Sequence, residues 1–140
     1  MKLYLIGSLR NPQVPIVATQ LRVAGYEVFD DWMAAGPEAD DWWQKYETDR
    51  GHDFKAALQG HAAHHVYEFD KAHLDSSDAC VLLLPAGKSG HLEFGYMMGK
   101  GKPGWILMDG DPERFDVMYQ FAGCVTAKLD FAIEYLKANV

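Results

Sequence analysis

Asp78-Ala79-Cys80-Val81-Leu82-Leu83-Leu84 is a stretch in which every residue after the first is apolar. A strand that is buried on both faces of a parallel sheet has such a run, whereas a strand with one solvated face alternates apolar and polar residues. The stretch therefore predicts the central strand of a parallel sheet over residues 78–84.

Four further strands and the helices between them are predicted on either side of this run. Apolar segments predict strands at residues 2–7, 26–29, 105–108 and 123–126. Helices are predicted after Asn11, which caps the first of them, and at residues 56–76, 89–99, 113–121 and 129–136. Alternating strands and helices predict a doubly wound α/β fold, flavodoxin-like or Rossmann-like, with about five parallel strands and helices on both faces.

Composition narrows the class of protein. A chain of 140 residues with 49% apolar residues fits one globular domain over residues 1–140. The formal net charge of -7 argues against a nucleic-acid polymer as partner, although one local pocket would still suffice for a mononucleotide. The sequence shows no signal peptide and no membrane span, so we expect a cytoplasmic protein. Cys80 and Cys124 are expected to be buried, reduced thiols.

Three segments are predicted to meet at the ligand-binding edge of this sheet. Ligands of doubly wound sheets bind beyond the carboxyl ends of the strands, which here are residues 7–11, 29–32 and 85–93. In the first segment, backbone amides, the Ser8 hydroxyl and the Arg10 guanidinium are suited to hold a phosphate. Lys88 could add positive charge from the third segment.

Two carboxylates flank the central strand. Ser89 is expected to cap the helix that follows the strand, which would place Glu93 one turn in, where the helix dipole would keep it ionised as a nucleophile. Asp70 is expected near the start of the helix before the strand, and the two carboxyl groups could divide acid and nucleophile roles. The spacing alone allows both to be solvated helix residues instead.

The region between the second and third strands carries two further candidates. Residues 30–59 show no clean period and predict a long, partly helical excursion. Its aromatic residues could stack on a base or pack as a lid; these are Trp32, Trp42, Trp43 and Tyr46. The histidines that follow, His61, His64 and His65, include one metal-binding spacing but no His-Glu-x-x-His pattern, so a solvated or subunit-facing surface is favoured and no metal site is predicted.

Three blocks of residues together resemble the nucleoside 2-deoxyribosyltransferase superfamily, which includes the 2′-deoxynucleoside 5′-monophosphate N-hydrolases. The first is Leu3-Tyr4-Leu5-Ile6-Gly7-Ser8-Leu9-Arg10, and the second is Asp70, eight residues before Asp78. The third is Ser89-Gly90-His91-Leu92-Glu93-Phe94-Gly95-Tyr96, followed by Gly101-Lys102-Pro103. The blocks span residues 3–107, so the resemblance covers most of the chain.

The resemblance implies roles for individual residues. Glu93 matches the nucleophile that forms a glycosyl-enzyme ester, Asp70 the carboxylate that protonates or positions the leaving base, and Tyr4 the tyrosine that orients the nucleophile. Asp116 matches a polar residue that enters the neighbouring subunit's site, so a homodimer or larger homo-oligomer with shared active sites is expected. No cofactor and no metal are implied. The remaining implied substrate contacts are Gly7, Ser8, Arg10, Trp32, Gly87, Lys88, Ser89 and Gly90.

Departures from the family pattern leave the substrate open. Gly87 stands where transferases of the family often carry an aspartate, whereas Asp116 would repel a 5′-phosphate and Ser8, Arg10 and Lys88 would attract one. The predicted function is a retaining N-glycosidase that acts on a nucleoside 5′-monophosphate or nucleoside, with water as acceptor. A 2-deoxyribosyltransferase is the first alternative. A nucleotide-binding module without turnover and an NAD-type glycohydrolase are the others.

Overall fold

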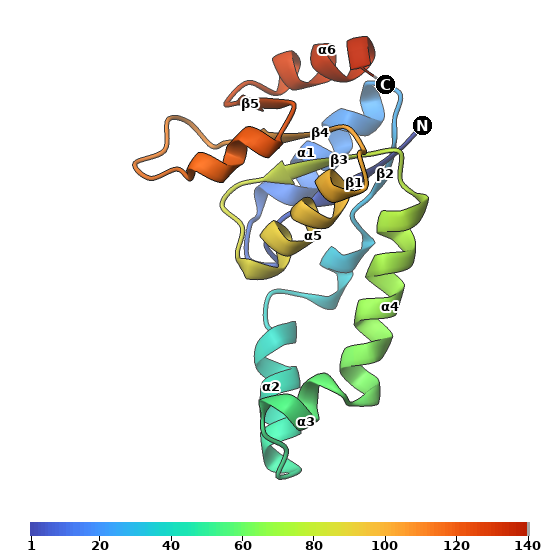
Figure 1. Cartoon of the computed structure of the whole chain (residues 1–140), viewed down its shortest axis with the longest axis vertical. Helices are drawn as coiled ribbons and strands as arrows, with labels where there is room; N and C mark the ends of the chain where they lie inside the picture. The colour runs from blue at the N-terminus through green and yellow to red at the C-terminus, as the bar shows by residue number, and fades with distance from the viewer. Residues whose placement is uncertain (140) are drawn as a thin grey trace.

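The computed structural model describes residues 1–139 and has a five-stranded parallel sheet at its centre (Figure 1). The strand order is β2-β1-β3-β4-β5, so β3 is central, and all five of its residues are buried. Both the doubly wound parallel fold and the central position of the apolar run are confirmed. The strands are β1 (Lys2–Ile6), β2 (Glu27–Phe29), β3 (Ala79–Leu83), β4 (Gly104–Leu107) and β5 (Cys124–Thr126).

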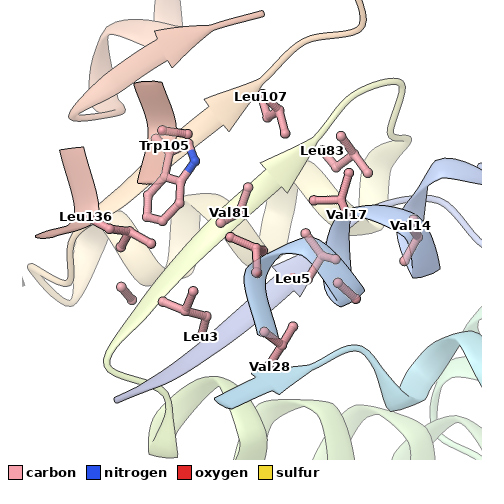
Figure 2. Close-up of a cluster of buried hydrophobic side chains, with 14 residues drawn as sticks. Leu3, Leu5, Val14, Val17, Val28, Val81, Leu83, Trp105, Leu107 and Leu136 are labelled. Atoms are coloured by element: carbon pink, nitrogen blue, oxygen red, sulfur yellow. The ribbon is translucent and has the colours of Figure 1, made fainter. Parts of the chain in front are cut away.

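Helices cover both faces of the sheet. Two of them, α1 and α6, pack on one face around a core that includes Leu3, Val81 and Trp105 (Figure 2). Helix α5 and the C-terminal part of α4 cover the other face. The helices are α1 (Gln13–Val23), α2 (Ala39–Asp49), α3 (Phe54–Leu58), α4 (His61–Ser76), α5 (Lys88–Gly99) and α6 (Leu129–Asn139), with short 3-10 helices η1 (Asp31–Ala35) and η2 (Val117–Phe121).

The alternation of side chains along β1 decides which residues face α4 and α5. Successive side chains of a strand point to opposite faces of its sheet. Leu3 and Leu5 therefore join the core under α1 and α6, whereas Tyr4 and Ile6 join the core under α4 and α5. Tyr4 is thus on the face that also carries Asp70 of α4 and Glu93 of α5.

The long excursion between β2 and β3 is partly helical, as predicted. It contains η1, α2 and α3, and α2 and α3 extend away from the sheet together with the first half of α4 (Figure 1). Within it, the buried side chain of Glu47 is hydrogen-bonded to His52, with 2.5 Å between Glu47 Oε2 and His52 Nδ1. The helix predicted at residues 56–76 is divided at Gln59 and Gly60, because the backbone of Gly60 is extended and begins a new helix, α4; Asp53 caps the separate short helix α3.

Three local predictions are wrong. Residues 113–116 are not helical, because Asp116 is extended and its carboxylate accepts the Met118 N–H at 2.7 Å, which starts η2 instead. Asp70 lies in the second half of α4 and not near its start. Cys124 is only half-buried, although Cys80 is buried, and both thiols are free.

None of the helices found in residues 1–139 is sufficiently long and apolar to span a bilayer.

Candidate active site

Helix α5 carries Glu93 and lies against β1 and β3 through a glycine. The helix begins at Lys88 after Gly87, so Ser89 is an exposed residue of the first turn and not the predicted cap. Gly90 is buried, and a Cβ atom there would lie 3.2 Å from both Ala86 Cβ and Ile6 Cγ2. The missing side chain therefore lets the first turn of α5 approach the strands, which fixes the position of Glu93 in the next turn.

Glu93, Tyr4 and Asp70 come together on this face of the sheet. The pKa of Glu93 rises from 4.5 to about 7, mainly because burial disfavours the charged carboxylate. The Tyr4 hydroxyl acts on the carboxylate as a hydrogen-bond donor and lowers this pKa, whereas the charge of Asp70 raises it. Burial likewise raises the pKa of Asp70 and, together with the two carboxylates, that of Tyr4.

Burial thus opposes the ionisation of Glu93 that the sequence predicts from the helix dipole, and a pKa of about 7 leaves the carboxyl group partly charged at neutral pH. Glu93 Oε2 is also buried without a hydrogen-bond partner among residues 1–139. An oxygen in these surroundings is poorly solvated, which is a property that a carboxylate nucleophile requires.

A pocket opens between the loops that follow β1 and β3. It measures about 240 Å³ and is lined by Ser8, Arg10, Asn11, Pro85, Ala86 and Gly87. Three of these are predicted substrate contacts, so the structure brings Ser8, Arg10 and Gly87 together. Glu93 does not line this pocket. It lies in the second turn of α5, which begins at Lys88, immediately after the lining residue Gly87. Lys88 is exposed and does not line the pocket either.

Arg10 is already paired within the chain. Its Nη2 atom forms an ion pair with Asp41 of α2 at 2.6 Å, and its Nε donates to the Pro37 carbonyl oxygen at 3.3 Å. Both side chains of the pair are about two-thirds exposed, so the pair is weak and open to competition by another anion. The predicted phosphate ligand Arg10 thus also connects the pocket to the excursion.

Trp32 is fixed at the carboxyl end of β1. Its indole Nε1 donates to the Leu5 carbonyl oxygen at 2.8 Å, and its ring lies 3.6 Å from the place where a Cβ of Gly7 would be. The ring packs against the cores on both faces of the sheet. The other aromatic candidates, Trp42, Trp43 and Tyr46, all lie on α2.

The remaining candidates lie apart from the three catalytic candidates. Asp116 is exposed and caps η2, which is tied to α5 by a hydrogen bond between His91 Nε2 and the Tyr119 hydroxyl at 3.0 Å. His61, His64 and His65 line a pocket of about 520 Å³ at the start of α4, at the end of that helix away from the sheet (Figure 1). Entry of Asp116 into a partner's site stays a prediction.

Asn11 is a site residue that the sequence does not reveal. It was expected only to cap α1, and its Oδ1 does accept the Gln13 N–H at 3.0 Å. The structure adds that Asn11 lines the pocket, is 5% exposed, and has a buried amide nitrogen, Nδ2, without a hydrogen-bond partner among residues 1–139. No spacing or motif signals this, since Ser, Thr or Asp would cap the helix equally well.

Comparisons with known proteins show where this fold occurs. No protein-family model and no curated protein sequence matches the chain. Among solved structures, a 2-deoxyribosyltransferase from the psychrotolerant bacterium Bacillus psychrosaccharolyticus superposes with a TM-score of 0.65 at 18% identity, over 96% of this chain and 92% of that chain. The CMP N-glycosidase BcmB of Clostridium botulinum superposes with a TM-score of 0.58 at 12% identity, over 98% of this chain and 99% of that chain. The chain therefore has the fold of these two enzymes, as its resemblance to the nucleoside 2-deoxyribosyltransferase superfamily predicts.

Proposed function

We propose that this chain is an enzyme that cleaves the N-glycosidic bond of a nucleoside 5′-monophosphate or nucleoside by double displacement through Glu93. The observation that carries the proposal is the buried, unpartnered Oε2 of Glu93 beside Tyr4 and Asp70. The shared fold with a 2-deoxyribosyltransferase and a CMP N-glycosidase supports it, because both of those enzymes act on that bond.

In the first step Glu93 is the nucleophile and Asp70 the acid. The Glu93 carboxylate attacks C1′, the bond between C1′ and the base nitrogen breaks, and its electron pair leaves with the base. Asp70 gives its proton to the departing base, for which a pKa raised by burial is suitable. The Tyr4 hydroxyl orients the Glu93 carboxylate and stabilises its charged form before the attack.

The second step releases the sugar. Water attacks C1′ of the glycosyl ester, its proton passes to Asp70, and the bond between C1′ and Glu93 breaks. The products are the free base and a sugar or sugar 5-phosphate with retained configuration at C1. Both carboxyl groups return to their starting protonation states, so no further reactant is required.

A mass-spectrometric trapping experiment tests the assignment. We would incubate the protein with CMP, cytidine and their 2′-deoxy forms, follow base release by chromatography, and quench for peptide mapping. A sugar adduct on Glu93, lost in Glu93→Gln together with base release, is expected. An adduct on Asp70 would show that the two roles are exchanged. Absence of base release from a broad panel of nucleosides and nucleotides, NAD included, would refute the proposal.

An uncharged nucleoside as substrate, on which a 2-deoxyribosyltransferase would act, is the alternative that one observation favours. Arg10 is paired with Asp41 at 2.6 Å, which reduces the positive charge offered to a 5′-phosphate and suits an uncharged nucleoside. Asp41→Asn distinguishes the two substrates, because it removes the competing anion. If the substrate is a monophosphate, the variant should lower its KM several-fold, whereas the KM for a nucleoside should not change. Adding a free acceptor base to the assay then detects transfer directly.

A further inference from the structure

The amide of Asn11 is fixed in orientation by its surroundings. Its backbone N–H donates to the Ser8 carbonyl oxygen at 3.0 Å, and its backbone carbonyl oxygen accepts the Val14 N–H at 3.2 Å. The side-chain oxygen accepts the Gln13 N–H at 3.0 Å, and only an oxygen can accept there. The amide cannot be flipped, so the atom left buried without a partner is the NH₂ group.

The cap on α1 does not explain this NH₂ group. Ser, Thr or Asp would accept the Gln13 N–H without burying two unpaired N–H donors. Buried donors in proteins almost always have a partner, and an exception calls for a specific cause. Asn11 is 95% buried, as its exposure of 5% implies, and it forms part of the wall of the 240 Å³ pocket beside Ser8 and Arg10.

The place of this pocket relative to Glu93 suggests which part of a ligand meets Asn11. If Glu93 meets C1′ of a nucleoside, the pocket formed by the loops before α1 and α5 is placed to receive the other end of the sugar, because C1′ and C4′ flank the ring oxygen and C4′ carries C5′. A donor there needs an oxygen acceptor, which the substituent on C5′ provides as a hydroxyl or phosphate oxygen.

We propose that Asn11 is a specificity-determining residue of this site, whose Nδ2 donates a hydrogen bond to an oxygen on C5′ of the substrate. The inference rests on the proposed function. It adds to the loop a neutral donor that, unlike the Arg10 guanidinium, has no competing partner within residues 1–139.

Two substitutions test the proposal with the whole chain. Asn11→Asp keeps the capping oxygen and replaces the NH₂ donor by a second oxygen, whereas Asn11→Ser keeps a capping oxygen and provides no donor at that place. We would measure kcat and KM for CMP and for cytidine, and thermal unfolding of each variant. The expected result is a KM for CMP that rises about tenfold or more in both variants, with kcat within about twofold of wild type. Asn11→Ser buries no charge and should keep a Tm close to that of wild type, whereas Asn11→Asp should lower the Tm at neutral pH.

The outcomes separate this inference from the proposed function. A rise in KM for CMP alone that is also present in the uncharged Asn11→Ser assigns the contact to a phosphate oxygen, and an equal rise for cytidine assigns it to the C5′ oxygen. A rise for CMP in Asn11→Asp only would show charge repulsion and would overturn the inference. Unchanged KM values for both substrates would overturn the inference, as would failure of both variants to fold, since that would give the amide a structural role. If wild type releases no base, the proposed function fails, and calorimetric titration of CMP into wild type and Asn11→Asp still decides whether Asn11 binds it.

Discussion

Replacing Glu93 with Gln should stabilise the protein at alkaline pH while abolishing its activity. The pKa of Glu93 is about 7 in the folded chain and has an ordinary value of 4.5 in an unfolded chain. Between these values the folded state binds the proton that the unfolded state has lost, so stability falls as pH rises. At about 1.4 kcal/mol for each pKa unit, the buried carboxylate costs about 3 kcal/mol once the pH exceeds 7.

Urea denaturation of wild type and Glu93→Gln at about pH 5 and about pH 8 measures this cost. Glutamine carries no charge, so we expect the variant to exceed wild type in free energy of unfolding by about 3 kcal/mol at the higher pH and by less than about 1 kcal/mol at the lower. Glu134→Gln is the matched control, because Glu134 is exposed on α6 and its side chain makes no hydrogen bond or ion pair within residues 1–139.

A difference between Glu93→Gln and wild type that is the same at both pH values would refute this reasoning. So would a variant that is less stable than wild type at the higher pH, since it would show that the ionised carboxylate is stabilised by its surroundings. A change of similar size in Glu134→Gln would show that the effect is one of net charge and not of burial.

Three further perturbations bear on the same site. Tyr4→Phe removes the donor that lowers the pKa of Glu93, so the acid limb of the kcat/KM profile should move to higher pH, and an unmoved limb would count against the contact. Asp70→Asn removes the proposed acid, so base release should slow far more than binding weakens, and an equal loss of both would count against that role. Gly90→Ala should destabilise the protein by about 1–3 kcal/mol and lower activity, because its Cβ meets three side chains within 3.4 Å. Gly95→Ala in the same helix meets nothing within 4 Å and should be neutral or stabilising by up to about 1 kcal/mol by urea denaturation.

The sheet could be predicted from the sequence because its strands are short apolar runs separated by turn residues. The run at residues 79–83 lies at the centre of the sheet and is buried on both faces, which is the reason it contains no polar residue. The helix predicted at residues 113–121 failed because a local contact decides it. The Asp116 carboxylate takes the Met118 N–H, and the chain before it stays extended.

The sequence predicts which residues form the candidate site, but it does not predict their pKa values. Tyr4, Asp70 and Glu93 are far apart in sequence, and family resemblance grouped them before the structure placed them on one face. The pKa of Glu93 depends on how closely α5 packs on β1, which periodicity does not reveal. The unpaired amide nitrogen of Asn11 was not predicted for a different reason: the capping oxygen of the side chain already explains an asparagine at that position.

The alternation of side chains along β1 places residues that determine stability and residues of the candidate site on opposite faces of the sheet. In many enzymes, a gain in one of these properties lowers the other. Leu3 and Leu5 pack under α1 and α6, while Tyr4 between them lies on the opposite face with the candidate catalytic carboxylates. Substitutions under α1 and α6 share no direct contact with that layer, so their stability effects should add to those of active-site changes. One face of the sheet can thus be redesigned for robustness, and the other can be evolved toward new substrates.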